Sequence, residues 1–159
     1  HLSATNHIRS MKIIDYKPHH LDEVINEPKN NGSPPVLGHM KNQASELHLP
    51  GWSFTLIHQG HIQCVAGIMP LWNGVGEAWM IATSRIHNNQ RQFIRYAKNG
   101  VMQRLIDEHE LWRVQANCKV GWSQALRFAR MMGFKQEGVM KKYGPEQDDY
   151  HRVAWVKNG

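Results

Sequence analysis

The last quarter of the chain, residues 111–156, constrains the fold most, because it alternates a strand, a helix and two further strands. Its helical part, residues 122–134, places apolar side chains three and four positions apart, so they form one stripe along a helix. Gly133 follows the stripe, and glycine readily adopts the left-handed backbone that ends a helix. The stripe, which we expect to face a core, consists of Trp122, Ala125, Leu126, Ala129 and Met132.

The alternation of strands and helices continues through the rest of the chain. Short apolar runs bounded by Gly, Pro and Asn predict strands, whereas apolar residues three and four apart predict helices. Gln59-Gly60 separates two of the strands and predicts a tight hairpin. This order predicts an α/β (α+β) domain. The expected strands cover residues 12–16, 52–58, 61–70 and 77–83, and the expected helices cover residues 18–27, 36–47 and 90–110.

The expected helix at residues 90–110 is the longest in the chain. Gly100 lies inside it and costs about 1 kcal/mol relative to alanine in a helix, so we expect a bend near this position. The side chains expected to be buried are Phe93, Ile94, Ala97, Val101, Leu105 and Ile106.

Length and composition fit one globular domain. The chain has 159 residues and is 41% hydrophobic, and a domain of this size buries about 70% of its unfolded surface. We interpret residues 1–10 as the remnant of an added sequence ahead of a natural start at Met11, and residues 11–159 as a single domain. The apolar runs are too short to cross a bilayer and no signal-peptide pattern occurs, so we expect a cytoplasmic protein without a membrane partner. A homodimer is compatible with the sequence.

Histidine and cysteine are not spaced as metal ligands. The histidines are scattered, without an H-E-x-x-H motif or a Cys/His pattern of the kind that zinc needs, so we expect no metal site. Cys64 and Cys118 both fall within apolar segments that read as strands, where a free thiol packs as a small hydrophobe.

The end of the chain carries a pattern that resembles a known family. Residues 125–134 read A-x-x-F-x-x-x-x-G-F, and residues 135–143 follow as a strand. This pattern is similar to the closing segment of the GNAT superfamily of acetyl-coenzyme A dependent N-acetyltransferases, and the order of elements over residues 11–156 is similar too. The resemblance implies the GNAT fold, a mixed central sheet flanked by helices. It also implies transfer of an acetyl group from acetyl-CoA to an amine of a protein or small molecule.

Residues 131–145 closely resemble the ends of phage and prophage acetyltransferase-like proteins. Some relatives of that group are internal virion proteins of short-tailed phages. The resemblance implies the cytoplasm of a host cell, or a virion, as the location. It also leaves open a second function, that of a virion or host-interaction protein that keeps the fold without catalysis.

A coenzyme A site is implied around residues 85–91. In the GNAT family the pyrophosphate lies on backbone N–H groups at the start of the long central helix, where the helix dipole favours negative charge. These groups belong to a loop of the form Q/R-x-x-G-x-G/A, which matches residues 85–90 here. The residues that the resemblance implies for cofactor binding are Arg85, Asn88, Asn89, Gln90 and Arg91.

Two positions of this loop depart from the family pattern. Asn88 replaces the first glycine, and the bulkier Gln90 replaces the second small residue. Asparagine tolerates a left-handed backbone better than most residues, so we expect Asn88 to adopt one and preserve the turn. The alternative is that the asparagines form an ordinary N-cap before an amphipathic helix.

The strand before this loop is implied to hold the acyl end of the cofactor. In the family it splays from its neighbour, and its exposed backbone pairs with the pantetheine arm as an added strand would. The matching residues are Met80, Ile81 and Ala82.

Transfer to an amine requires a general base, because the amine must lose a proton. Glu77 lies at the head of an otherwise apolar strand, where burial would raise its pKa into a useful range, and we predict that it is the base. The alternative is a strand-end carboxylate in solvent.

The departing thiolate can take a proton from a hydroxyl group, and many GNAT enzymes use a tyrosine on the last helix. The matching position here is Ala129. Tyr143, at the end of the next expected strand, is the nearest substitute, unless it is simply a strand-favouring aromatic. We expect direct attack by the amine, whose acceptor site would be framed by residues 28–50 and 144–150.

The net charge of +6 supports a third interpretation, a module that binds nucleic acid. The sequence contains no nucleic-acid motif, and the basic residues are dispersed, with some gathering near the end of the chain. Those residues are Arg127, Arg130, Lys135, Lys141 and Lys142.

Overall fold

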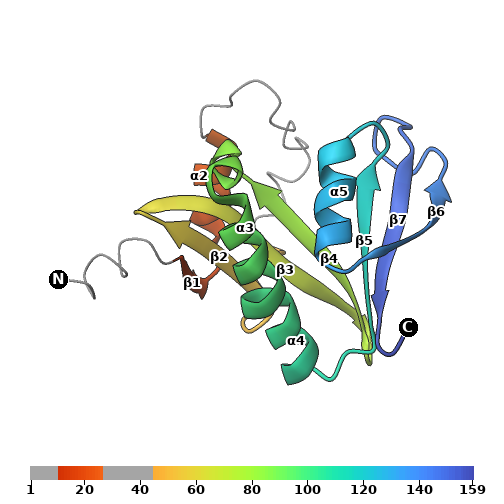
Figure 1. Cartoon of the computed structure of the whole chain (residues 1–159), viewed down its shortest axis with the longest axis horizontal. Coiled ribbons are helices and arrows are strands. Elements are labelled where there is room, and N and C mark those ends of the chain that lie inside the picture. Colours follow the sequence, from red (N-terminus) through yellow and green to blue (C-terminus); the bar gives the residue numbers. More distant parts are fainter. Residues whose placement is uncertain (1–10, 27–44) are drawn as a thin grey trace. The chain divides into compact units, whose positions relative to one another are not determined.

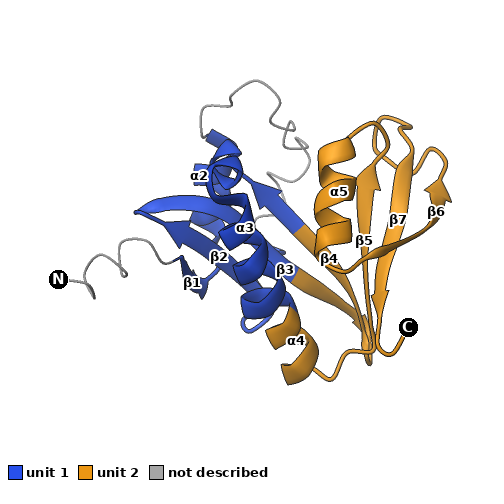
Figure 2. Cartoon of the chain, viewed as in Figure 1, with its two compact units in different colours: residues 1–67, 80–102 blue, residues 68–79, 103–159 orange. Residues whose placement is uncertain are grey.

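The computed structural model describes residues 11–26 and 45–159, which fall into two compact units (Figure 2). Unit 1 contains Met80–Met102 and the described residues up to Gly67, and unit 2 contains Ile68–Trp79 and Gln103–Gly159. Seven strands within the described residues form a mixed sheet in the order β1-β2-β3-β4-β5-β7-β6 (Figure 1). The expected fold class is therefore confirmed. That residues 11–159 form one domain stays a prediction.

The elements follow the expected order closely. The strands are β1 (Lys12–Asp15), β2 (Ser53–His58), β3 (His61–Trp72), β4 (Val75–Ala82), β5 (Arg113–Lys119), β6 (Lys135–Met140) and β7 (Tyr150–Val156). The helices are α2 (Pro18–Asn26), the 3-10 helix η2 (Ser84–Asn89), α3 (Gln90–Arg95), the π-helix η3 (Tyr96–Met102), α4 (Gln103–Glu108) and α5 (Ser123–Met131). The helix expected at residues 36–47 lies almost wholly outside the described residues.

Unit 1 is built on the antiparallel strands β1, β2 and β3. The predicted hairpin between β2 and β3 is confirmed, because His58 pairs with His61 and the two residues between them, Gln59 and Gly60, both have positive φ, as a type I′ turn requires. Completely buried side chains fill the core of this unit. They come from the strands, from α2 and from α3, and include Leu21, Leu56, Val65 and Phe93.

The helical turns continue from residue 90 to residue 108, but they do not form one regular α-helix. Seven residues around Gly100 are π-helical, which widens the helix where we expected a bend. A Cβ atom at Gly100 would lie 2.5 Å from Cδ1 of Ile13 on β1, so the glycine permits this close approach. The predicted buried side of the helix is confirmed except at Ile94, which is half-buried.

Unit 2 is built around β5. One side of β5 pairs in parallel with residues 75–77 of β4, and the other side pairs antiparallel with β7 along its whole length. Side chains alternate between the two faces of a strand, and Val114 and Cys118 point to the buried face. Helix α5 contacts β5, but its predicted stripe is only partly buried. Ala129 and Met132 are buried, whereas Trp122, Ala125 and Leu126 are half-buried.

Both cysteines lie in strands and are buried and free, as expected. Burial raises the pKa of both thiols, and Cys64 is the more deeply buried of the two. Neither thiol is therefore activated as a nucleophile. Among the described helices, none is both long and apolar enough to span a membrane.

A buried histidine joins α2 to β2 in unit 1. Nδ1 of His20 accepts a hydrogen bond from the Lys17 backbone N–H at 3.0 Å and lies 2.7 Å from Oγ1 of Thr55. Desolvation by burial, together with the neighbouring His19, lowers the pKa of His20 below its usual value. Protonation at Nδ1 would remove the acceptor that Lys17 uses, so the folded state favours the neutral ring.

We expect this histidine to make unfolding depend on pH. The unfolded chain has the higher pKa, about 6.5, so the stability that His20 contributes is present above that pH. It is lost as the pH falls from there through the lower pKa of the folded state. His20→Asn keeps an acceptor for the Lys17 N–H but does not titrate, so it should flatten the decrease in melting temperature between pH 7.5 and pH 5. A decrease as steep as in the wild type would contradict this role, and the exposed His87, changed to Asn, serves as control.

Candidate functional site

The predicted site residues fall into two groups, one in each unit. The residues implied for cofactor binding follow one another in unit 1. Met80, Ile81 and Ala82 end β4; Arg85, Asn88 and Asn89 lie in η2; and Gln90 and Arg91 begin α3. Glu77 and Tyr143, the predicted base and acid, both belong to unit 2.

The end of β4 is anchored by a residue that the sequence did not point to. The Thr83 backbone N–H donates to the Gln63 carbonyl of β3 at 2.9 Å, and the Thr83 hydroxyl accepts from the Arg85 N–H at 3.3 Å. Thr83 is also the N-cap of η2. It therefore fixes where β4 ends and where the turn that follows begins. A threonine directly before Ser-Arg was the available signal, because Thr and Ser are common caps.

The turn itself differs from the expected conformation. Asn88 lies within the 3-10 helix η2, and it is not among the described residues with positive φ. The expectation of a left-handed Asn88 is therefore wrong. A 3-10 helix pairs each N–H with the carbonyl three residues earlier, so the residues before Asn88 hold it in a right-handed turn. In this conformation the N–H groups in the later part of η2, including that of Asn88, pair within the turn.

The start of α3 keeps features that suit an anion. Asn89 is the N-cap, with φ −140° and ψ 52°, and its side chain makes no capping hydrogen bond. Asn89 therefore occupies the cap position of the alternative interpretation, but without the side-chain hydrogen bond of an ordinary asparagine cap. Gln90 and Arg91 are exposed, so their side chains are accessible at the positive end of the helix dipole.

Glu77 lies at the last position of the ladder between β4 and β5, opposite Gln115. Its Oε1 accepts a hydrogen bond from Nε2 of Gln115 at 3.2 Å, and it lies 3.9 Å from Nη2 of Arg152 on β7. The side chain is 32% exposed, so the expected deep burial is not observed. Glu77 is instead a partly accessible carboxylate, held in place by a neutral amide and near one guanidinium.

Tyr143 lies in a different place from the one predicted. Strand β6 ends at Met140, so Tyr143 belongs to the loop between β6 and β7. The expectation of a strand position fails because Lys142, with φ 54°, turns the chain directly before it. The Tyr143 ring is half exposed and packs edge-on against Tyr150, and its hydroxyl accepts from Nδ2 of Asn117 at 3.3 Å.

Asn117 and Arg152 are candidate functional residues that we did not predict. They face each other on β5 and β7, on the same face as Gln115 and Glu77. Oδ1 of Asn117 and Nε of Arg152 are buried and have no hydrogen-bond partner. The available signal was a polar residue at every second position of β5, whose other residues are apolar.

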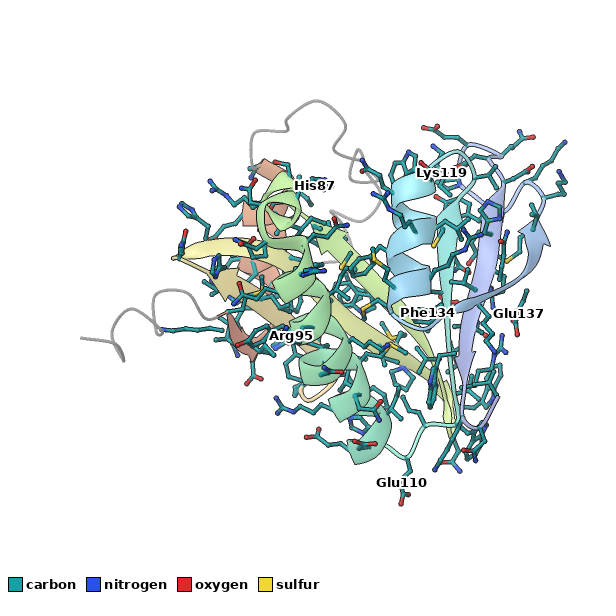
Figure 3. All side chains as sticks on the ribbon, in the orientation of Figure 1. His87, Arg95, Glu110, Lys119, Phe134 and Glu137 are labelled. Atoms are coloured by element: carbon teal, nitrogen blue, oxygen red, sulfur yellow. The ribbon has the colours of Figure 1, made fainter. Side chains whose placement is uncertain are left out.

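Acidic side chains pair with many of the basic residues in unit 2. Arg113 forms two hydrogen bonds with Glu137 of β6, labelled in Figure 3, and this contact lowers the pKa of the Glu137 carboxyl. Lys141 lies 3.2 Å from Asp149, and Lys119 lies 3.5 Å from Asp148. Among the five basic residues that suggested nucleic-acid binding, Lys141 is in such a pair. Within residues 11–26 and 45–159, no group of three or more His, Cys, Asp or Glu side chains could hold a metal ion.

Solved structures share this architecture over nearly the whole chain. The chain is similar to Ard1 from Thermoplasma volcanium, with a TM-score of 0.71 and 11% identity over 93% of this chain and 98% of that one. It is also similar to a GNAT-family acetyltransferase from Bacillus anthracis, with a TM-score of 0.64 and 12% identity over 95% and 97%. The fold is that of the GNAT acetyltransferases.

A third similar structure is a spermidine N-acetyltransferase SpeG mutant from Vibrio cholerae, with a TM-score of 0.66 and 11% identity over 94% of this chain and 95% of that one. No protein-family model matches the sequence, and no curated protein is similar to it in sequence. At these identities the likeness establishes the fold alone.

We expect a charge placed at the start of α3 to separate folding from cofactor binding. Asn89→Asp is an equally good N-cap residue and its charge complements the helix dipole, so it should keep or raise the melting temperature of the protein alone. The same carboxylate would repel a pyrophosphate, so coenzyme A affinity measured by calorimetry should fall about 10-fold or more, the effect of one charged contact. Asn89→Ser, which caps without charge, is the matched control. Equal affinity in the Asp and Ser variants would remove the start of α3 from the cofactor site.

Proposed function

We propose that the protein is an N-acetyltransferase, which moves the acetyl group of acetyl-CoA to an amine by direct attack. The observation that carries this proposal is the placement of Glu77 within a GNAT fold. The carboxylate lies where the β4–β5 ladder ends, oriented by Gln115 and still accessible from solvent. A carboxylate in that setting can accept a proton from an incoming amine.

The cofactor would be held by unit 1. The ladder between β4 and β5 ends at Glu77, and Met80, Ile81 and Ala82 continue β4 beyond it, so their backbone would pair with the pantetheine arm. Arg91 and the start of α3 fit the negative charge of the pyrophosphate. The 3-10 turn fits it less well, because the N–H groups in its later part pair within the turn. We infer that η2 opens when the cofactor binds, which frees N–H groups near Asn88, Asn89 and Gln90, and that Arg85 contributes a further positive charge.

The chemistry requires one new bond and one broken bond. The amine nitrogen attacks the thioester carbonyl carbon, a C–N bond forms, and the C–S bond breaks as the thiolate leaves. The proton lost by the amine goes to Glu77, and the thiolate takes a proton from Tyr143 or from water. Because a thiolate is a stable leaving group, the contribution of Tyr143 is the smaller one.

A protein with the GNAT fold but without acetyl transfer is the second candidate. Two observations favour it. Ala129, which occupies the position of the usual tyrosine, is buried and carries no hydroxyl. The N–H groups in the later part of η2 pair within the turn. A role in a virion or in contact with a host protein would fit this candidate, and the resemblance of residues 131–145 to phage proteins supports it.

We expect Glu77→Gln to lower acetyl transfer about 100-fold or more at neutral pH, the usual scale for a positioned base, because glutamine cannot accept the proton. The amide keeps a hydrogen-bonding partner for Gln115, so fold and cofactor affinity should persist. Tyr143→Phe should have a milder effect. Transfer is measured as free thiol released with an acceptor found by screening amines.

Glu108→Gln is the control, because Glu108 is an exposed carboxylate on α4. Full activity of Glu77→Gln from pH 6 to pH 9, below saturating acceptor, would show that water or the acceptor itself supplies the base.

A further inference from the structure

One face of the sheet in unit 2 collects polar side chains with unused hydrogen-bonding capacity. Glu77 is paired with Gln115 in the β4–β5 ladder, and Asn117 is paired with Arg152 in the β5–β7 ladder. Because Gln115 and Asn117 are two residues apart, all four side chains point to the same face. Paired side chains on neighbouring strands lie close enough to interact, so these four residues form one continuous group. We call it the β4–β5–β7 polar group.

Arg152 has weak partners for a partly buried cation. Its Nη2 donates to Sδ of Met140 at 3.3 Å, and a thioether is a poor acceptor. The carboxylate of Glu77 forms only a long ion pair with it, at 3.9 Å, beyond hydrogen-bond distance. Glu137 is close enough for Arg152 to lower its pKa, but its hydrogen bonds go to Arg113. The Nε atom of Arg152 is buried without a partner. A guanidinium normally binds a carboxylate through two parallel N–H donors, and here neither Nε nor Nη2 donates to a carboxylate.

Asn117 shows the complementary deficit. Its Nδ2 donates to the Tyr143 hydroxyl, whereas its Oδ1 is buried and accepts nothing. A buried polar atom without a partner costs stability, and native proteins have few of them. Two such atoms, one donor and one acceptor, occur here on directly paired residues. Because both residues are themselves partly exposed, a ligand with both an anionic acceptor and an N–H donor would satisfy both atoms once it displaces the groups that cover them.

We propose that the β4–β5–β7 polar group binds the amine acceptor as an α-amino acid, with its carboxylate on Arg152 and its amino group between Glu77 and Asn117. This inference rests on the proposed function, since it assigns the acceptor of that reaction. An amine without a carboxylate leaves Nε of Arg152 unpaired and brings a second positive charge towards the guanidinium. An α-amino acid carries its two charges on neighbouring groups, which matches a guanidinium and a carboxylate only 3.9 Å apart.

The selectivity follows from the same contacts. A lysine side chain within a protein presents an ammonium group far from any carboxylate of its own, so it would not engage Arg152. The site therefore selects free amino acids over amines and over protein lysines. Residues outside the β4–β5–β7 polar group determine which amino-acid side chain the site prefers.

The test compares each common amino acid with the amine formed by removing its carboxyl group, as matched acceptors. For the wild type, kcat/KM with acetyl-CoA should be about 10- to 100-fold higher for the amino acid, the scale of a lost hydrogen bond to a charged group. Arg152→Lys keeps the charge but removes the fork, and Arg152→Met removes both. In each variant the preference should vanish, mainly through a higher KM for the amino acid. Arg104→Met on α4 removes an exposed guanidinium and should change nothing.

Binding is also measured without the cofactor, by NMR, from the side-chain signals of Asn117 and Arg152 during titration with amino acids. Shifts of both signals, absent with the matched amines, are the expected result. Shifts without any acetyl transfer would keep this site and overturn the proposed function. Equal kcat/KM for amines with and without the carboxyl group would overturn this inference and keep the proposed function. No shift with any amino acid would overturn the inference as well.

Discussion

The register of β5 determines where the chemistry of unit 2 is placed. Val114 and Cys118 point to the buried face of β5. Because side chains alternate along a strand, Gln115 and Asn117 point to the opposite face. The ladder with β7 is continuous along β5, whereas the parallel ladder with β4 spans only three pairs. A slip of one residue would move every polar side chain of β5 into the apolar core, so the burial of Val114 fixes the register firmly.

That register gives the candidate site its particular character. It brings an accessible carboxylate, a guanidinium without a carboxylate at hydrogen-bond distance and a partly unpaired amide onto one face of three neighbouring strands. Strands hold side chains more rigidly than loops do, so these three groups are preorganised for a ligand with opposite charges. The cost is two buried polar atoms without partners, and such a cost is commonly found where a protein binds or reacts.

Periodicity predicted the elements well, because burial and turn chemistry both act over short distances. The Gln59-Gly60 hairpin and the buried side of the helix at residues 90–108 followed directly from local patterns. Local patterns failed where neighbours in space decide. Asn88 is right-handed because η2 continues through it, and Tyr143 leaves the strand because Lys142 turns the chain. Arg152 was missed because its unmet hydrogen-bonding capacity appears only once its neighbours on β4, β5 and β6 are in place.

Isothermal titration calorimetry with acetyl-CoA, together with the melting temperature, tests whether this GNAT fold binds the cofactor. We expect saturable binding at one site per chain. Because a ligand that binds only the folded state stabilises it, acetyl-CoA at about 100 times its dissociation constant should add about 2.7 kcal/mol and raise the melting temperature. Absence of both heat and thermal shift at millimolar acetyl-CoA would contradict the proposed acetyl transfer, and would leave a GNAT fold that serves another purpose.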